Sequence, residues 1–405
     1  MARAPVRPDN IRRHNLGLLL EQIHGEGELS RAELTQRLGL NRSTVGALVA
    51  ELCELGLVSE NVPMGSERAG RPSHLVGPRP DGPYAVAIEV DVDHVVTAAV
   101  RLGGQVLVRI DHNLSSSSVD PATIASLIAD DLEPLAAAVP SGAWPIGLGV
   151  SIPGTVRRTD GGVDHAPNLQ WRDEPFADRL FKRVGRGLPI YLGNDADLGA
   201  LAEHLRGVGR DSGNLLYLSG KIGVGGGLIV DGRQLAGSAG FAGEVGHMVV
   251  DPAGPSCHCG SNGCLETFVG DAALLRFSER TGVPGRDSVA SLVADARAGD
   301  QRALDGIRTV GRWLGLGIAN VVNLLNPDMV ITGGSLADVL ELARPEIEHQ
   351  LDRHAMIASR RIVQLRVPGL GRDSSLLGAA ELAFQLMLSD PVGASAARPA
   401  APVAT

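Results

Sequence analysis

Three cysteines and one histidine form the densest group of metal-binding side chains in the sequence. Cys257, Cys259 and Cys264 lie close together, and His247 precedes them on the chain. Three thiolates and one imidazole are the ligands of a closed tetrahedral zinc site, and the intervening glycines let the backbone turn so that the sulfurs converge. We therefore predict one structural Zn²⁺ ion bound by these four residues. The alternative is a set of buried free thiols beside a hydrogen-bonded His247.

A second group of carboxylate and amide side chains falls in turns at the ends of predicted strands and in loops. Such groups accept hydrogen bonds from adjacent hydroxyls, so their combination suits a polyhydroxylated ligand. Each residue alone is better explained as a helix cap, a turn residue or a solvated carboxylate, and only the combination supports a binding site. The predicted members are Gly154, Asn168, Asn194, Asp195, Glu244, His247 and Glu266.

Two glycine-rich segments also follow predicted strands, at Gly220–Gly227 and Thr332–Gly334. Glycine loops let backbone amides approach a phosphate group, but they also occur wherever the chain turns tightly. Both interpretations stay open for these segments.

The beginning of the chain predicts a helix-turn-helix unit. Residues 10–24 carry apolar side chains at helical spacing, and the Ser30–Glu33 segment is a capping box that begins a second helix. Gly39 ends that helix, and Asn41 can cap a third helix that runs to about Leu55. Two helices joined by a short turn that contains glycine are typical of a DNA-binding motif.

Basic and polar residues lie where such a motif contacts DNA. Arg42, Ser43 and Thr44 are at the start of the third helix, the end that enters the major groove. Residues 65–72 predict a basic β-wing, which makes residues 1–78 a winged helix-turn-helix domain. Each arginine alone is also explained as solvated surface. The predicted DNA-binding residues are Ser30, Arg31, Asn41, Arg42, Ser43, Thr44, Arg68 and Arg71.

The charge is distributed unevenly along the 405 residues. The chain has a net charge of −9, whereas residues 1–78 carry nine arginines against nine acidic residues, so the predicted DNA-binding domain is neutral. The rest of the chain would be repelled by DNA, but a neutral domain with a local basic face is not. No apolar run approaches the roughly 18 residues of a membrane span, and the first residues do not resemble a secretion signal. We expect a cytoplasmic protein that does not insert into membranes.

The remaining sequence predicts a mixed α/β core. Strands at residues 84–90, 95–100 and 106–110 precede a helix at 121–138 and a further strand at 146–151. A similar succession follows, with strands at residues 214–218, 227–230 and 329–332. The two halves therefore look like similar lobes.

The order of these motifs resembles the ROK family, named for repressors, open reading frames and kinases, over nearly the whole chain. The family's recognition stretch is similar to Ile222–His247, and the run Cys257–Glu266 follows at the family's spacing. The resemblance implies an actin-like, or ribonuclease-H-like, two-lobed sugar kinase core with the sugar between the lobes. It places Asn194, Asp195, Glu244, His247 and Glu266 at the sugar, together with Gly154 and Asn168. It also implies that His247 both binds zinc and shapes the sugar pocket.

The resemblance, with the composition, gives a domain division. Residues 84–195 form the first lobe and residues 196–373 the second lobe with the zinc site, while a helix at 374–389 packs back on the first lobe. Residues 79–83 are predicted as a linker because of their prolines and glycine. Residues 390–405 are rich in alanine, proline and serine and are predicted to be disordered.

The phosphate-binding turns of the family's kinases are altered in this chain. Kinase members have Asp-x-Gly-Gly-Thr after the first strand, whereas this chain has Glu89-Val90-Asp91-Val92-Asp93. Carboxylates and a branched side chain then stand where an anion should bind, which opposes ATP binding. The second turn, Gly-Thr-Gly in kinases, is Lys221-Ile222-Gly223 here. Asp195 occupies the position of the catalytic base in kinase members, and we interpret it as a hydroxyl acceptor, with no catalytic residue in this chain.

Three functions remain from the sequence. The favoured one is a repressor of carbohydrate uptake or catabolism genes that responds to a sugar or sugar phosphate and binds a two-fold-symmetric operator as a homodimer or homotetramer. The second is an ATP-dependent, glucokinase-like sugar kinase that carries a DNA-binding domain, since Lys221 offers a cation for a phosphate. The third is a zinc-dependent interaction scaffold that binds neither sugar nor ATP.

Overall fold

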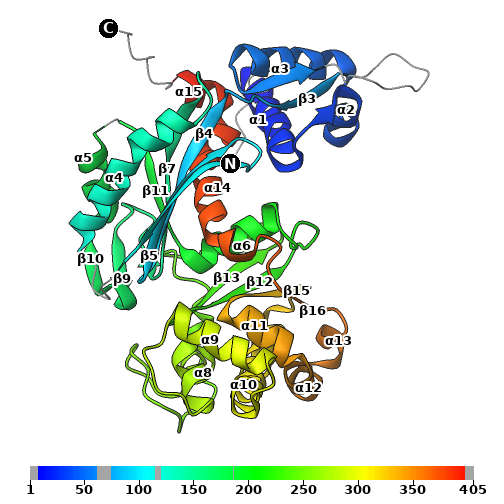
Figure 1. The fold of residues 1–405 in the computed structure, drawn as a ribbon. Helices are drawn as coiled ribbons and strands as arrows, with labels where there is room; N and C mark the ends of the chain where they lie inside the picture. The colour runs from blue at the N-terminus through cyan, green and yellow to red at the C-terminus, as the bar shows by residue number, and fades with distance from the viewer. Residues whose placement is uncertain (1–7, 62–73, 115–119, 186, 397–405) are drawn as a thin grey trace.

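The computed structural model describes residues 8–61, 74–114, 120–185 and 187–396 (Figure 1). A small N-terminal domain is followed by two larger lobes, each built on a five-stranded sheet. The predicted fold class, a winged helix-turn-helix joined to a two-lobed α/β core, is confirmed.

The N-terminal domain contains three helices and a small antiparallel sheet of order β1-β3-β2. The elements are α1 (Pro8–Glu26), β1 (Leu29–Ser30), α2 (Arg31–Leu38), α3 (Arg42–Glu54), β2 (Val58–Asn61) and β3 (Leu75–Pro78). Both predicted helix caps form. The Ser30 hydroxyl accepts from the Glu33 amide while the Glu33 carboxylate accepts from the Ser30 amide, and Asn41 accepts from the Thr44 amide. These caps satisfy amides that have no partner inside the helices.

The first lobe has a sheet of order β11-β7-β4-β5-β6. Its strands are β4 (Pro83–Val90), β5 (His94–Arg101), β6 (Val106–Asn113), β7 (Trp144–Ile152) and β11 (Ile190–Asn194). Helices α4 (Pro121–Ala138) and α5 (Phe176–Val184) cover one face (Figure 1). A small sheet of β8 (Thr155–Val156), β9 (Val163–Ala166) and β10 (Trp171–Glu174), with the 3-10 helix η1 (Pro167–Leu169), borders the end of β7.

The second lobe repeats this topology with the order β14-β13-β12-β15-β16. Its strands are β12 (Leu215–Gly220), β13 (Val224–Val230), β14 (Arg233–Gln234), β15 (Met329–Gly334) and β16 (Gln364–Arg366). In both sheets three antiparallel strands are followed by two parallel ones. The helices of this lobe are α7 (Glu266–Val269), α8 (Asp271–Phe277), α9 (Arg286–Arg297), α10 (Gln301–Leu325), α11 (Ser335–Leu342), α12 (Arg344–His354) and α13 (Ile357–Arg360), with the 3-10 helices η2 (Val245–His247) and η3 (Gly371–Asp373).

Two helices pack between the sheets. Helix α6 (Asp195–Leu205) follows β11 and packs on β12 and β13, while α14 (Ser374–Ser389) packs on α6 and on the β4 and β7 strands. Gly149 of β7 lets α14 lie directly on the first sheet, since a Cβ there would come within 1.8 Å of the Ala379 carbonyl oxygen. Helix α14 therefore packs back on the first sheet.

The core of the N-terminal domain continues into the first lobe. Leu16, Leu20 and Ile23 of α1 belong to the same cluster of buried side chains as Ala383 and Phe384 of α14. The predicted linker is a tight turn at residues 79–82, and Pro83 is already the first residue of β4. The N-terminal domain is thus fixed to the first lobe by shared apolar burial.

The predicted disorder of residues 390–405 is wrong for the first part of this segment. Residues Pro391–Ala396 form helix α15, and Val392 and Ala394 pack against the shared core. Asp390 accepts a hydrogen bond from the Gly393 amide at the start of this helix. Composition suggested a tail because alanine and proline are common in disordered segments, but these side chains have a partner surface on α1. Residues 397–405 lie outside the described residues.

None of the described helices combines the length and the apolar character that a membrane crossing requires.

Candidate functional site

A cavity of about 140 Å³ lies between the two sheets. A cavity of about 150 Å³ holds one benzene molecule, so the space suits a single six-membered ring. The lining comes from the ends of β7 and β11 in the first lobe and from the β12–β13 turn, η2 and α7 in the second. All seven residues expected at the sugar line it, namely Gly154, Asn168, Asn194, Asp195, Glu244, His247 and Glu266.

Asn194 holds the first-lobe side of this cavity in place. It caps α6, because its Oδ1 atom accepts from the amides of Ala196 and Asp197, and its Nδ2 atom donates to the Gly154 carbonyl oxygen at 2.9 Å. Gly154 has φ of 152°, and a Cβ there would meet the His165 carbonyl oxygen at 2.6 Å. Asn194 therefore positions the β7 loop, and the neighbouring Asp195 presents its carboxylate to the cavity.

Lys221 joins the two lobes through charge. Its ammonium nitrogen lies 2.6 Å from Oδ2 of Asp91, 3.1 Å from Oε1 of Glu89 and 3.5 Å from Oδ2 of Asp195. Glu89 lies near the end of the buried strand β4 and Asp91 directly follows that strand, whereas Lys221 lies in the β12–β13 turn. One ammonium faces three carboxylates, so the cluster is net negative.

The ionisation of this cluster is set by burial and by the mutual charges. Burial would lower the pKa of Lys221, but the carboxylates of Asp91, Glu89 and Asp195 outweigh it and raise the pKa above its usual value. Burial would likewise raise the pKa of Asp91, yet the Lys221 ammonium lowers it overall. Asp195 differs, since burial and the two nearby carboxylates raise its pKa despite Lys221. The sequence offers Lys221 as a cation for a phosphate, but in the structure the carboxylates of the cluster already compensate its charge.

The second-lobe side of the cavity carries a chain of polar contacts. Glu266 accepts from the Val224 amide at 3.0 Å and lies 3.0 Å from Nδ1 of His258. Glu244 lies 3.9 Å from Nε2 of His247, and burial raises the Glu244 pKa. His258 lines the cavity but was not among the residues predicted from sequence. Its position between two predicted metal ligands was the available signal.

The glycine-rich segments mainly serve close packing. Gly225 and Gly227 belong to β13, where a Cβ would come within 2.9 Å of the Ala196 side chain and 2.4 Å of its carbonyl oxygen. Gly333 and Gly334 end β15 against Tyr217 and Gly220. These glycines let α6 and the strands approach each other, which is the alternative to phosphate contact that the sequence left open.

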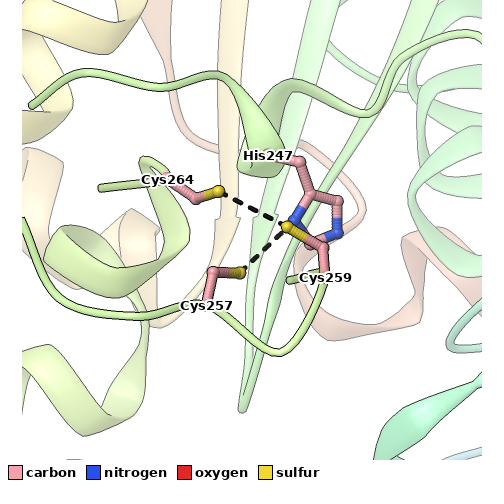
Figure 2. A group of neighbouring side chains, drawn as sticks. All are labelled: His247, Cys257, Cys259 and Cys264. Carbon is pink, nitrogen blue, oxygen red and sulfur yellow. Dashed lines mark hydrogen bonds between the residues drawn. The ribbon is translucent and has the colours of Figure 1, made fainter. Parts of the chain in front are cut away.

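The three predicted cysteine ligands and His247 converge, and Figure 2 shows their side chains pointing toward one another. Cys257 Sγ lies 3.6 Å from Nδ1 of His247, and the sulfurs of Cys259 and Cys264 are 3.6 Å apart. Zinc bound tetrahedrally with Zn–S bonds of about 2.3 Å requires sulfurs about 3.8 Å apart, whereas a disulfide requires about 2.05 Å. The four ligand atoms lie within 4.8 Å of one another, so the cluster fits a metal ion.

The predicted DNA-binding residues divide into two places. Asn41, Arg42 and Ser43 are exposed around the start of α3, where the Ser43 hydroxyl donates to the capping Asn41 at 2.7 Å. Arg42 has no ion pair with a described residue. Arg31 lies instead at the start of α2 and pairs with Glu60 of β2 at 2.6 Å. The Ser30 hydroxyl and the Thr44 amide are used in helix caps, and Arg68 and Arg71 lie outside the described residues.

Comparison with known proteins agrees with this architecture. Residues 85–386 match the model of the ROK family, and residues 17–63 match that of the MarR family. The chain belongs to the ROK family. A DNA-binding domain joined to a ROK domain places it among that family's transcriptional regulators, which confirms the resemblance found in the sequence.

Similar proteins include both repressors and kinases. A putative xylose repressor from Caldicellulosiruptor sp. (strain Rt8B.4) is 31% identical over 393 residues, which cover 94% of this chain and 98% of that protein. The crystal structure of a ROK family transcriptional regulator, a homolog of the E. coli MLC protein, superposes with a TM-score of 0.77 at 25% identity, covering 96% and 99% of the two chains. A ROK family glucokinase from Streptomyces griseus, solved with glucose and AMPPNP, has a TM-score of 0.63 at 28% identity and covers 75% of this chain and 99% of its own.

Proposed function

We propose that the chain is a transcriptional repressor in which an uncharged sugar, bound between the lobes, changes the affinity of the winged helix for its operator. The observation that carries this proposal is the combination of a complete polar cavity with a phosphate turn filled by the Lys221 cluster. Residues 1–78 would bind DNA, while residues 84–195 with helix 374–389 and residues 196–373 would form the two lobes that bind the sugar. Relatives named xylose repressor support genes of carbohydrate uptake or catabolism as targets.

The sugar would be held by side chains from both lobes. Asp195 from the first lobe and Glu244 and Glu266 from the second accept hydrogen bonds from hydroxyl groups, and carboxylates suit adjacent hydroxyls because each has two oxygens. Asn168 and His247 line the same space, while Asn194 and Gly154 position the loop. Hydrogen bonds to charged groups contribute about 1.5–3 kcal/mol each, so a few of them give a neutral sugar useful affinity.

Phosphorylated ligands are disfavoured by charge. Three carboxylates surround one ammonium, and Asp271 lies close by, with its amide donating to the Lys221 carbonyl oxygen at 3.3 Å. A phosphate would bring two further negative charges into a site that is already net negative and has a reduced dielectric constant. The same argument opposes ATP and therefore phosphoryl transfer. Related glucokinases match the ROK domain of this chain, so a sugar kinase is the rival function.

The cysteine cluster would bind a structural Zn²⁺ ion. Cys257, Cys259, Cys264 and His247 supply four ligands and leave no position for a catalytic water. Burial raises the pKa of the Cys257 thiol to about 12 and also raises that of Cys264, and a bound divalent cation would deprotonate the thiols that coordinate it. Bound zinc would fix His247 and hence the wall of the sugar cavity.

Operator binding would use two copies of the chain. One winged helix contacts only one half-site, and useful specificity requires two recognition helices about one DNA turn apart or a multiple of it. Arg42 and Ser43 at the start of α3 would contact base edges or phosphates. A homodimer or homotetramer would present them with two-fold symmetry.

A thermal-shift screen tests this function. D-xylose, D-glucose, their phosphate esters and ATP with magnesium would each be added to the full chain, because a ligand that binds the folded state raises its melting temperature. A free sugar should raise the melting temperature, and the phosphates and ATP should not. A shift with ATP, accompanied by sugar-dependent ADP release, would establish the kinase instead. If no sugar shifted the melting temperature, the zinc-dependent interaction scaffold would be the remaining function.

A further inference from the structure

Helix α6 extends from the sugar cavity to the DNA-binding domain. Its N-cap Asn194 and its first residue Asp195 line the cavity, and Arg206 follows its last turn. With a rise of about 1.5 Å per residue, the eleven residues of α6 span about 16 Å. The two ends of one short helix therefore contact the two sites that a sugar-responsive repressor must connect.

Arg206 lies at a buried junction of four segments. Its Nη1 atom donates to the carbonyl oxygens of His24 and Gly103, both at 3.0 Å, and its Nε atom is paired with Glu381. His24 belongs to α1 of the DNA-binding domain, Gly103 to the turn after β5, and Glu381 to α14. The side chains of His24, Arg206 and Glu381 are only 4%, 10% and 2% exposed.

The other contacts of His24 complete this junction. Its Nε2 atom lies 2.8 Å from Oε2 of Glu381, and its Nδ1 atom accepts from the Gly103 amide at 3.0 Å. Burial would raise the pKa of Glu381, but His24 and Arg206 lower it to about 2. Glu381 is thus an anion at neutral pH, and Arg206 supplies the fixed positive charge beside it. Nothing in the junction can be removed without leaving a buried polar group unpaired.

The helices that meet here cannot slide past one another. Glu203 of α6 is fully buried and accepts from the amides of Gly369 and Leu370 and from the Ser374 hydroxyl, which ties α6 to the start of α14. A Cβ on Gly378 of α14 would come within 2.0 Å of the Leu198 carbonyl oxygen. At the far end of α14, a Cβ on Gly17 of α1 would come within 2.6 Å of the Leu388 carbonyl oxygen. Contacts this close transmit a displacement rather than absorb it.

We propose that Arg206 is a positioning residue that couples the sugar cavity to the DNA-binding domain, by holding α1 to the end of α6. This inference rests on the proposed function. A sugar that bridges Asp195 to Glu244 and Glu266 changes the relation of the lobes at the start of α6. Because Arg206 fixes His24 to the other end of that helix, the change reaches α1 and the spacing of the paired recognition helices. This is a contiguous chain of packed side chains and hydrogen bonds between two sites, of the kind that carries energetic coupling.

The test compares the full chain with Arg206→Ala, using D-xylose and D-glucose as probes and an operator duplex selected from random DNA on the parent protein. Calorimetry measures sugar affinity, and fluorescence anisotropy measures operator affinity with and without sugar. Coupled sites typically change each other's affinity by about 5–150-fold. In the parent, sugar should change the operator dissociation constant by a factor in this range. In Arg206→Ala this factor should fall toward 1, while sugar affinity stays within about twofold because Arg206 does not line the cavity.

Two further variants separate coupling from folding. Arg206→Lys keeps the charge beside Glu381 but loses the planar fork that reaches both carbonyl oxygens, so it should fold and show an intermediate factor even if Arg206→Ala does not fold. Arg302→Ala, at an arginine whose side chain is 80% exposed, is the control and should behave as the parent. By thermodynamic reciprocity, operator should change sugar affinity by the same factor in each variant.

The outcomes distinguish this inference from the function on which it rests. If sugar changes operator affinity in the parent and by the same factor in every Arg206 variant that folds, the coupling role of Arg206 is wrong and the proposed function stands. If no sugar changes operator binding by the parent, both are wrong. A factor that is reduced in Arg206→Lys and near 1 in Arg206→Ala, with sugar binding intact, supports both.

Discussion

The ammonium nitrogen of Lys221 lies 2.6 Å from Oδ2 of Asp91, which belongs to the opposite lobe. The same ammonium contacts Glu89 and Asp195, so one positive charge links the end of β4, the start of α6 and the β12–β13 turn. The resemblance found in the sequence implies that these turns correspond to the phosphate turns of the family's kinases. Here the chain supplies its own cation and anions, and the space is held by an internal ion cluster.

Removing Lys221 should destabilise the protein more than removing a lysine on the surface. Lys221→Met leaves Glu89, Asp91 and Asp195 without a counter-charge in a buried site, and breaking a buried ion pair in this way costs about 3–5 kcal/mol. The melting temperature should fall clearly in thermal denaturation. Lys182→Met is the matched control, because the Lys182 side chain is 73% exposed and its pair with Asp178 is a surface pair. Equal melting temperatures for the two variants would contradict the stabilising role of Lys221.

The chain should not phosphorylate hexoses or pentoses. The family resemblance places Asp91 and Lys221 in the first and second phosphate turns, where the Lys221 ammonium is already paired with Asp91 at 2.6 Å and its charge is not free to bind a phosphate. A coupled assay with ATP, magnesium and D-glucose or D-xylose should detect no sugar-dependent ADP release. Turnover that depends on sugar and disappears in Asp195→Asn would instead establish a kinase.

Local structure was predictable from sequence because its causes are local. The capping box at Ser30 and Glu33 and the cap at Asn41 begin α2 and α3 where expected, and α4 has its predicted bounds of residues 121–138. The glycine run was harder to interpret. Gly225 and Gly227 belong to β13, where the absence of side chains lets Ala196 of α6 pack against the strand. This contact joins distant segments, and no local sequence pattern indicates it.

Long-range partners could not be predicted for the same reason. The residues of the cavity were identifiable by type, but the pairing of Lys221 with Glu89 and Asp91 joins positions more than a hundred residues apart. The junction of His24, Arg206 and Glu381 left no sequence signal at all, since each residue alone resembles a surface residue on a helix. Helix α15 formed where composition suggested disorder because α1 offers it a surface.

Metal removal should loosen the second lobe and weaken sugar binding together. Metal analysis of protein purified without chelator should return one zinc per chain, and Cys259→Ser should lower both zinc content and melting temperature because three ligands hold zinc less tightly than four. Sugar affinity should also fall, since His247 belongs to both the cluster and the cavity wall. Cys53→Ser is the control, because Cys53 lies on α3 and should leave the zinc content unchanged. Protein that contains no zinc when first purified would refute the site.

Asp197 should give the stability a distinctive dependence on pH. Burial raises its pKa to about 7, with Glu244 and Asp195 adding to this and Gln234 opposing it, and its Oδ1 atom has no hydrogen-bond partner among the described residues. The folded state therefore keeps a proton that the unfolded chain releases above about pH 4, and stability is lost as the pH rises from about 4 to about 7. Asp197→Asn removes this loss.

Denaturant titrations at several pH values measure the effect. Asp197→Asn should gain stability over the parent as the pH rises, by at most about 4 kcal/mol at pH 8, since each pKa unit corresponds to about 1.4 kcal/mol. The two proteins should converge near pH 4. Asp130→Asn, at a side chain that is 72% exposed, should follow the parent throughout. A constant difference between Asp197→Asn and the parent at every pH would contradict the raised pKa.

DNA binding and sugar binding should be separable by single substitutions. Arg42 is exposed at the start of α3 and has no ion pair with a described residue, so its guanidinium is available for DNA. Arg42→Ala should weaken operator binding by about 1–3 kcal/mol, or roughly 5–150-fold, while sugar affinity stays unchanged. Glu244→Ala should instead weaken sugar binding and leave operator affinity unchanged, because Glu244 lines the cavity and a hydrogen bond to a carboxylate contributes about 1.5–3 kcal/mol. Anisotropy with operator DNA and calorimetry with sugar measure both affinities for each variant. If well-folded Glu244→Ala lost operator binding in the absence of sugar, or if Arg42→Ala bound the operator as the parent does, the assignment of the two activities to the two domains would be wrong.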